Sequence, residues 1–379
     1  MSLSAIAAVT LAASGCGDSS EETDTAVAKN CSAKIGFLGA LTGVAAPIGT
    51  SVRNSVELAI EQFTEQNPTC VVELVEKDAP AALPSQAPKP AQEFADDPSI
   101  IGVVGPTSST DGGAIGEIMS KAGLPMIAPA ADSTELSQQG WTTFHRSLGT
   151  TDAQGAAAGR YIKNILYLEK VFLVHDTRPY GVGLADGLRK ALTPVDTATI
   201  EAYQTDFSAL VSRITSSGAD AVYVGAFAQE AGLLLNQLRA AGSTAAFASS
   251  GGSKADDFVK LAGATEAEGT IITCSCAPPD KTGGTYYVDY KARFNSEPTE
   301  YSPEGFDAAN ILLAGIKAGK TTRVDLEAYV DAYEGKGVTG EFRFTPEGDV
   351  DPDLVSLWAY AVRSGKILPD QKMFATVPK

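Results

Sequence analysis

Histidine is scarce in this chain, and the common catalytic sequence patterns are missing. The 379 residues contain only two histidines, His145 and His175. There is no HExxH zinc motif, no Gly-x-Ser-x-Gly nucleophile elbow and no Walker-type phosphate loop. A Ser-His-Asp triad assembled from distant segments stays open, because triads are spatial rather than sequential. With no local support for catalysis, we predict a protein that is not an enzyme and binds neither a metal nor a cofactor.

Long apolar runs and excess positive charge are missing as well. A membrane-spanning helix needs roughly 20 consecutive apolar residues, and no segment supplies them. The formal net charge is −17 and the sequence pI is about 4.6. Such an acidic surface repels phosphate backbones and anionic lipid. We therefore predict no nucleic-acid partner and no contact with a membrane except through a lipid.

That lipid is indicated by a cysteine near the N-terminus. Cys16 follows a short apolar run and ends the tetrapeptide Ala13-Ser14-Gly15-Cys16, which resembles a bacterial lipobox. Residues 1–16 are interpreted as a lipoprotein signal, and the polar residues 17–31 as a flexible tether. The Lys or Arg that normally precedes an export signal is absent, so we expect the true start to lie upstream. The alternative is a frayed N-terminus with a chance cysteine.

The other four cysteines fit an exported protein with disulfides. Four cysteines allow three pairings. We favour Cys31–Cys70, because each precedes a predicted strand and these strands should be neighbours; Cys274 and Cys276 would then pair locally. Zinc is the competing interpretation, but it calls for CxxC-type spacing or nearby histidines.

Short β-like runs alternate with helical stretches along the chain. Strands are expected at residues 33–38, 71–76, 100–105, 124–128, 171–174, 221–225, 246–249 and 270–273, and helices at 110–121, 152–166, 180–192, 208–216, 228–240 and 254–261, with a further helix capped by Ser51. Residues 78–92 should form a loop. Near-continuous apolar strands indicate parallel sheets covered on both faces. The length suggests two such α/β lobes, with ligands beyond the carboxyl ends of the strands.

Two of the loops after strands carry possible binding patterns. Residues 105–110 (GPTSST) combine hydroxyls with a helix N-terminus, which suits a carboxylate; an ordinary helix cap is the alternative. Gly181 and Gly183 follow a strand and enter a helix, but their spacing is not GxGxxG. A tight turn explains these glycines better than a nucleotide site does.

Taken in order, the segments of residues 32–365 resemble the periplasmic type I solute-binding proteins of ABC importers, in the leucine/isoleucine/valine-binding branch. The matching segments are IGFLGALTGVAAPIG, IIGVVGPTSS, GLPMIAPAADSTEL, FHRSLGTTDAQG, VFLVHDTRPYGVGLADGL, DFSALVSRITSSGADAVYVGAF, LLLNQLRAAG, YSPEGFDAANILLAGI and GEFRFTPEGD. The resemblance implies two Rossmann-like lobes joined by a three-crossing hinge. Lobe 1 would comprise residues 32–148 and 278–350, and lobe 2 residues 149–277 and 351–379.

The resemblance also implies a function. A small polar solute, an amino acid or a related compound, would bind in the inter-lobe cleft as the hinge closes, and the closed monomer would dock on ABC transporter permease domains outside the cytoplasmic membrane. Two alternatives stay open. One is a sensory receptor of the same fold that acts through a membrane partner; the other is a binder of a carboxylate or amide that is not an amino acid.

The resemblance assigns ligand positions one at a time. In relatives, the loops that hold the ligand carboxylate fall here on Ser108, Ser109, Ala130, Ala131 and Asp132, with Ser133 adjacent. The other positions are Ile48 in place of an opening-loop aromatic, Thr151 or Asp152 for the ammonium, Tyr180 for the loop tyrosine, Phe227 for a second aromatic, and Gly251.

Gly251 and Asp132 depart from the family pattern. Relatives that bind amino acids usually carry Glu or Asp at the position of Gly251, where it receives the ligand ammonium, and often Thr or Ser at the position of Asp132. An aspartate there repels a carboxylate unless a cation or an amino group neutralises it. Asp132, Asp152, Glu304 and Asp307 are the acids that we consider as replacements; a solvated or capping acid is the alternative for each.

Overall fold

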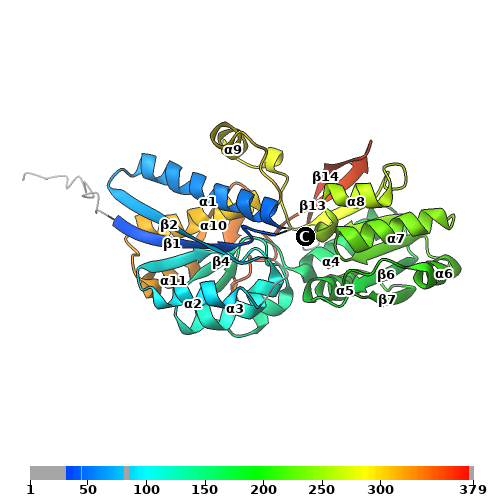
Figure 1. The fold of residues 1–379 in the computed structure, drawn as a ribbon, viewed down its shortest axis with the longest axis horizontal. Coiled ribbons are helices and arrows are strands. Elements are labelled where there is room, and N and C mark those ends of the chain that lie inside the picture. The colour runs from blue at the N-terminus through cyan, green and yellow to red at the C-terminus, as the bar shows by residue number, and fades with distance from the viewer. Residues whose placement is uncertain (1–30, 44, 81–84, 375–379) are drawn as a thin grey trace, which may run out of the picture.

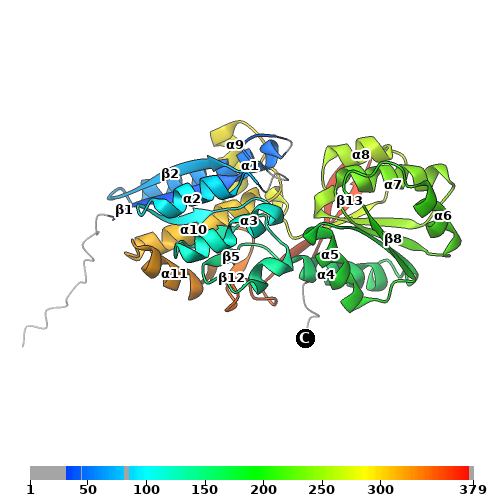
Figure 2. The same ribbon diagram turned by 60° about the horizontal axis from the view of Figure 1, so that its bottom comes forward.

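The computed structural model describes residues 31–43, 45–80 and 85–374 of the chain. It consists of two α/β lobes that lie side by side along the long axis of the molecule (Figures 1 and 2). Within the described ranges, no helix is both long and apolar enough to cross a membrane. The predicted leader, the tether and Cys16 lie outside the described residues.

Lobe 1 contains a five-stranded parallel sheet. Its strand order is β2 (Cys70–Asp78), β1 (Cys31–Gly39), β3 (Ile100–Val104), β4 (Met126–Ala128) and β5 (Phe144–Arg146). The helices are α1 (Ala46–Gln66), α2 (Pro88–Asp96), α3 (Ser109–Lys121), α9 (Tyr286–Phe294), α10 (Ser302–Lys317) and α11 (Arg323–Asp331), with the 3-10 helix η1 at Thr134–Gln138. A small hairpin of β11 (Glu334–Lys336) and β12 (Glu341–Arg343) follows α11.

Alternating side chains of the buried strands supply two separate cores in lobe 1. Ile35 and Phe37 join the core formed with α1 and α10, whereas Leu38 joins the core formed with α2 and α3. Successive side chains of a strand point to opposite faces, so a continuous apolar run places helices on both sides of the sheet. The carboxyl ends of the strands then stay open at one edge.

Lobe 2 contains a seven-stranded sheet. Its order is β14 (Lys366–Phe374), β13 (Ser356–Arg363), β10 (Ile271–Cys274), β9 (Ala246–Ser250), β8 (Ala221–Gly225), β6 (Val171–Asp176) and β7 (Asp196–Ile200), with only β13 and β14 antiparallel to their neighbours. The helices are α4 (Thr151–Asn164), α5 (Pro179–Ala191), α6 (Ser208–Ser216), α7 (Ala228–Ala240) and α8 (Asp256–Ala262). The 3-10 helices η2 (Gly251–Ser253) and η3 (Pro279–Lys281) follow β9 and β10.

The chain passes between the lobes three times. It leaves lobe 1 after β5, returns after β10 to form α9, α10 and α11, and crosses again before β13. Helix α10 then packs along α1, so distant parts of the sequence complete lobe 1 (Figure 1). The predicted two-lobed α/β fold with a three-crossing hinge is confirmed by this arrangement.

Most of the predicted elements are present, and two local predictions are wrong. The Ser51 helix begins five residues earlier, at Ala46, with a proline in its first turn. Ser51 is buried and its hydroxyl contacts Tyr290 and Ser302 instead of capping a helix. The expected loop at 78–92 gives way to α2 at Pro88, because proline is accepted in the first helical turn.

The structure contains two disulfides, one in each lobe. Cys31 bonds to Cys70 across the neighbouring strands β1 and β2, where the two residues are paired in register. Cys274 bonds to Cys276 where the chain leaves β10. These are the pairings that the sequence favoured.

Candidate functional site

The loop between β4 and η1 is fixed by a buried arginine. Arg146, at the end of β5, donates from Nη1 to the carbonyl oxygens of Ala131 (2.9 Å) and Ser133 (3.0 Å). Its Nε lies 2.7 Å from Asp349 Oδ1. Burial lowers the pKa of Arg146, and the Asp349 charge opposes that change. The guanidinium thus holds the backbone on both sides of Asp132 in one conformation.

Asp132 lies at the centre of that loop and is only 3% exposed. Its Oδ1 accepts from Ser109 Oγ and its Oδ2 from Ser275 Oγ, both at 3.4 Å. Ser109 begins α3 in lobe 1, and Ser275 lies on the second crossing, just after β10. Burial raises the pKa of Asp132 to about 7, and the Arg146 charge opposes the rise. A titratable carboxyl therefore lies where the two lobes meet.

The charge of this carboxyl acts on three buried tyrosines. Burial raises the pKa of Tyr180, Tyr223 and Tyr301, and the Asp132 charge raises each of them further. Tyr180 lies in the first turn of α5, is 7% exposed, and accepts a 2.9 Å hydrogen bond at its hydroxyl from the Gly252 backbone. Its ring lies 5.3 Å from that of Phe227. The lobe 2 side of the site is thus aromatic, and the nearby acids Asp176 and Glu230 are paired with Arg178, which lies over Phe227.

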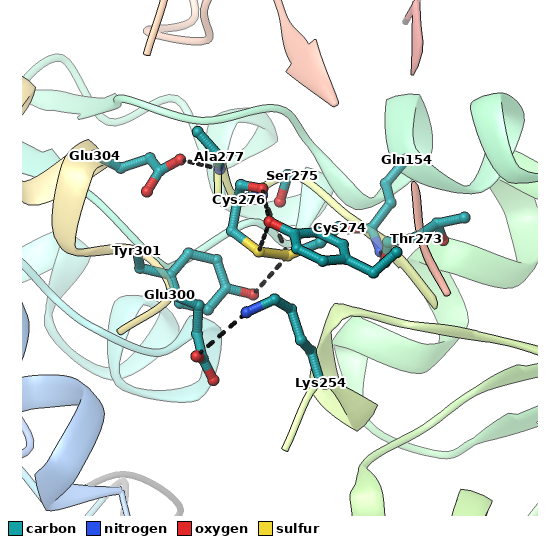
Figure 3. The surroundings of a disulfide bond; sticks show 12 residues. Gln154, Lys254, Thr273, Cys274, Ser275, Cys276, Ala277, Glu300, Tyr301 and Glu304 are labelled. Atoms are coloured by element: carbon teal, nitrogen blue, oxygen red, sulfur yellow. Dashed lines mark hydrogen bonds and ion pairs between the residues drawn. A yellow bond between two sulfur atoms is a disulfide. The ribbon is translucent and has the colours of Figure 1, made fainter. Parts of the chain in front are cut away.

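The Cys274–Cys276 disulfide fills the space beside Gly251. A Cβ atom added at Gly251 would lie 2.8 Å from Cys274 Sγ and 3.3 Å from the Tyr301 hydroxyl. Tyr301 Oη itself lies 3.9 Å from Cys274 Sγ, with its hydroxyl directed at the disulfide and with Glu300 and Lys254 nearby (Figure 3). A longer side chain at position 251 therefore has no room without displacing the disulfide.

Several of the predicted site residues serve the fold in this structure. Ser108 is the N-cap of α3, because its hydroxyl accepts from the Asp111 N–H. Ile48 packs on the core from the first turn of α1. Phe227 precedes α7, is 37% exposed and lies 4.3 Å beneath the Arg178 guanidinium. Ala130 is half-buried at the edge of the Asp132 loop.

The two candidates at the start of α4 have different surroundings. Thr151 is buried, and its N–H donates to the Asp132 carbonyl at 2.7 Å. A side chain at Gly183 would strike the Thr151 hydroxyl, so Gly183 allows α4 and α5 to pack closely. Asp152 instead pairs with Lys190 of α5 at 2.6 Å, at a half-exposed position. The structure therefore favours a structural role for Asp152.

The two remaining acids considered as replacements, Glu304 and Asp307, form hydrogen bonds with the hinge and with the β11–β12 hairpin. Glu304 accepts from the Ala277 N–H at 2.6 Å, and burial raises its pKa to about 8. Its carbonyl accepts from Ser147 Oγ, so Glu304 ties two crossings together. Asp307 accepts three hydrogen bonds from Val338 and Thr339 in the β11–β12 turn.

Two hollows adjoin the site without containing its centre. An open hollow of about 260 Å³ is lined by Ser109, Ser133 and Trp141 of lobe 1 and by Pro179 of lobe 2. A hollow of only about 10 Å³ lies along the crossings, between Ser275 and Glu304. Neither is lined by Asp132 or Tyr180, so these side chains are closed over by their neighbours.

One group of side chains in the described ranges has the composition of a metal site. His145, Glu327 and Asp331 offer donor atoms that lie within 4.8 Å of one another. Asp331 approaches His145 Nε2 at 3.0 Å, whereas Glu327 approaches Nδ1 at 4.0 Å. Carboxylates at different ring nitrogens suit ion pairing better than coordination of one ion. The absence of a bound metal stays a prediction.

Sequence reasoning missed three contributors to the site: Ser275, Ser250 and Tyr301. Ser275 lies between Cys274 and Cys276, and a serine between two paired cysteines carries no pattern that indicates a binding role. Ser250 ends β9 and donates to the Ala226 carbonyl beside Tyr180. Tyr301 precedes α10 in the left-handed region, with φ of 64°. A non-glycine residue in that region is a signal of functional constraint, but it is visible only in the backbone.

Comparisons with known proteins show the family of the chain. Residues 32–354 match the family described as periplasmic binding protein. The chain belongs to the periplasmic binding protein family. It is 29% identical to an amino acid binding protein of Pseudomonas aeruginosa over 83% of this chain and 87% of the relative. It is also 29% identical to the Leu/Ile/Val-binding protein BraC3 of Rhizobium johnstonii, covering 88% and 92%.

Solved structures of this family share the fold. The branched-chain amino acid transporter substrate-binding protein LivJ of Streptococcus pneumoniae, solved with isoleucine, superposes with a TM-score of 0.78 at 22% identity. The superposition covers 89% of this chain and all of that one. As a periplasmic binding protein, the chain is a solute-binding protein of an extracytoplasmic family and not an enzyme, and both predictions are confirmed by the family match.

Proposed function

We propose that this protein is the lipid-anchored solute-binding subunit of an ABC importer and that its solute is an amino acid or a closely related compound. The observation that carries the proposal is the meeting of Asp132 and Ser109 of lobe 1 with Ser275 and Tyr180 beside the hinge. The names of the relatives support an amino acid as the solute.

Binding in this arrangement follows from closure of the hinge. Asp132 and Tyr180 are nearly inaccessible in the present conformation, so a solute enters only when the lobes separate. Once the lobes close, the solute contacts both of them, and this differential contact shifts the population toward the closed form. Polar groups buried in the process must find partners, because each unpaired group costs roughly 1–3 kcal/mol.

A ligand panel tests the proposed solute class. The full chain is unfolded and refolded to remove carried-over ligand, and its thermal stability is measured with amino acids, short amides, urea-like compounds and small carboxylates. We expect a shift of several degrees with at least one amino acid, because a ligand that binds only the native state stabilises it. X-ray scattering should show compaction with the same compound. A panel without any shift would contradict the proposal.

The proposed anchor and partner have separate tests. Mass spectrometry of the exported protein should find a lipid on Cys16, and Cys16→Ala should release the protein from the membrane without altering solute binding. The closed form should bind the permease domains as a monomer, which light scattering and pull-down measure. Unmodified Cys16 in a membrane-associated protein would contradict the anchor alone.

A further inference from the structure

An ion pair joins the two lobes beside the Cys274–Cys276 disulfide. Lys254 follows η2 at the end of β9 in lobe 2, whereas Glu300 lies between α9 and α10 of lobe 1. Lys254 Nζ and Glu300 Oε2 are 3.6 Å apart (Figure 3), and the two side chains are only 14% and 16% exposed. Because water is largely excluded, the attraction within this pair is screened less than it would be at the surface.

The ammonium group of Lys254 is positioned by lobe 2. It lies 4.8 Å from the centroid of the Tyr360 ring in β13, which is within the range of a cation–π contact. Tyr360 is itself 2% exposed, and its hydroxyl donates to the Cys276 carbonyl at 3.0 Å. The lysine therefore has a fixed place on lobe 2, from which it reaches across to Glu300.

The carboxylate of Glu300 is positioned by lobe 1. The residue before it, Thr299, donates its N–H to Ser51 Oγ of α1 at 3.0 Å. The residue after it, Tyr301, has φ of 64° and directs its hydroxyl at Cys274 Sγ of lobe 2, 3.9 Å away. A tyrosine stays in the left-handed region only where its surroundings require it, and such positions cluster at ligand clamps and switch regions. This segment is thus anchored in lobe 1 and directed at lobe 2.

We propose that the Lys254–Glu300 pair is a latch that holds the lobes together over a bound solute and slows its release. The inference rests on the proposed function, to which it adds a determinant of the dissociation rate. The two charges belong to different lobes, so the pair exists only in the closed form and stabilises that form alone. When the lobes open, both groups regain contact with water, which offsets part of the attraction. The latch therefore delays opening without preventing it.

The latch is separate from the polar centre of the site. In the described part of the chain, neither Lys254 nor Glu300 forms a hydrogen bond or an ion pair with Asp132, and neither lines one of the two hollows. Removing the pair should thus leave the Asp132 loop and its contacts in place. What should change is the rate at which the lobes separate.

Stopped-flow binding kinetics of the full chain test the latch. The probes are the compounds of the thermal-shift panel that stabilise the parent, with the standard amino acids first and the short amides, urea-like compounds and small carboxylates after them. Lys254→Met removes the charge and keeps an unbranched apolar side chain on the Tyr360 ring. We expect its dissociation rate to be about 5- to 20-fold faster than the parent's, with an association rate within about 2-fold.

Lys291→Met is the matched control. Lys291 Nζ pairs with Glu297 Oε1 at 2.6 Å and lies 4.9 Å from the centroid of the Tyr287 ring, so it repeats the surroundings of Lys254 within lobe 1 alone. This variant should release the solute at the parent's rate. Equal acceleration in Lys291→Met and Lys254→Met would overturn the latch, because an ion pair within one lobe cannot hold two lobes together.

A double-mutant cycle provides a measurement that a purely structural role would not move. Glu300→Gln removes the other charge, and it keeps the test decisive if Lys254→Met fails to fold. Because either substitution abolishes the pair, both single variants and the double variant should release the solute at the same raised rate. Raising the NaCl concentration from about 0.05 M to about 0.5 M should speed release from the parent and from Lys291→Met, but should change release from these three variants little.

The outcomes separate the latch from the proposed function. If Lys254→Met and Glu300→Gln bind an amino acid and release it at the parent's rate, the latch is overturned while the function stands. The same holds if the effects of the two substitutions simply add, or if weaker binding comes from slower association. If the parent binds no member of the thermal-shift panel, the proposed function fails, and the latch fails with it.

Discussion

The two sides of the site are built by different means. On lobe 1, a buried ion pair between Arg146 and Asp349 fixes a loop that presents Asp132 and the Ser133 hydroxyl. On lobe 2, glycines allow close packing of an aromatic ring and a disulfide, and the acids Asp176 and Glu230 are paired with Arg178. Lobe 1 thus contributes a charged side chain on a fixed loop, whereas lobe 2 contributes closely packed apolar surface.

Under the proposed function, this difference places the acid of the site on lobe 1. At Gly251, on lobe 2, the neighbouring disulfide leaves no room for a side chain. The carboxylate at position 132 lies within the same cluster of tyrosines but is attached to the other lobe. A solute that bridges the lobes contacts the groups of both lobes at once, because only the closed form brings them together. It can therefore reach an acid on either lobe.

Arg146→Met breaks the support of lobe 1 and should have the largest effect. The change leaves Asp349 and two backbone carbonyls without their buried partner. We expect the free energy of unfolding to fall by about 3–5 kcal/mol, measured by urea denaturation. Arg189→Met removes an exposed pair with Asp186 and should cost at most about 1 kcal/mol. Equal losses in the two variants would show that the loop does not depend on Arg146.

Asp132→Asn removes the charge of lobe 1 and should stabilise the unliganded protein. The pKa of Asp132 is raised by burial from 3.8 to about 7. Between these values the native state holds a proton that the unfolded state has lost, so the free energy of unfolding falls as pH rises from 4 to 7. At pH 8 the penalty is on the order of 4 kcal/mol, because each pKa unit is worth about 1.4 kcal/mol.

The measurement is the difference in the free energy of unfolding between Asp132→Asn and the parent, from pH 4 to pH 8. Other buried carboxyls, such as Glu304 and Asp307, are present in both proteins and should largely cancel. Asp132→Asn should match the parent near pH 4 and exceed it increasingly up to pH 8. A constant difference, or a less stable variant at pH 8, would show that Asp132 is not held as an unpaired buried acid.

The lobes and most of their elements could be predicted from the sequence because strand–helix alternation is a local signal. Helices α6 and α7 begin and end at the predicted residues. The short strand β5 and the edge strand β7 were missed, since three residues carry no periodicity and an edge strand is only half apolar. Ser51 was assigned to a cap because its side-chain partners lie about 240 residues away.

The candidate site was predictable in part, for reasons that differ between the lobes. Loops after strands were expected to approach one another, but the family resemblance, rather than spacing, assigned Ser109, Asp132 and Tyr180 to the site. The sequence left four acids as candidates to replace the missing partner, because hydrogen bonding separates them and spacing does not. Asp152 is paired with Lys190 and Asp307 accepts hydrogen bonds from the β11–β12 turn, and only tertiary packing reveals that Asp132 is buried and forms no ion pair among the described residues.

Moving the acid from lobe 1 to lobe 2 tests whether the two sides of the site are equivalent. Of the changes considered, it should alter the free energy of unfolding least. Gly251→Glu places a Cβ atom 2.8 Å from Cys274 Sγ, and overpacking of this kind costs about 1–3 kcal/mol. Gly113→Ala is the matched control, because an added Cβ in α3 meets nothing within 4 Å; it should stabilise the protein by up to about 1 kcal/mol.

The decisive measurement is amino-acid binding by the double variant Asp132→Asn/Gly251→Glu. We expect no recovery of affinity, because the disulfide and the Tyr301 hydroxyl keep the new carboxylate out of the cluster. Full recovery would mean that an acid can serve the site from either lobe. The packing around Gly251 would then not explain why the acid lies on lobe 1.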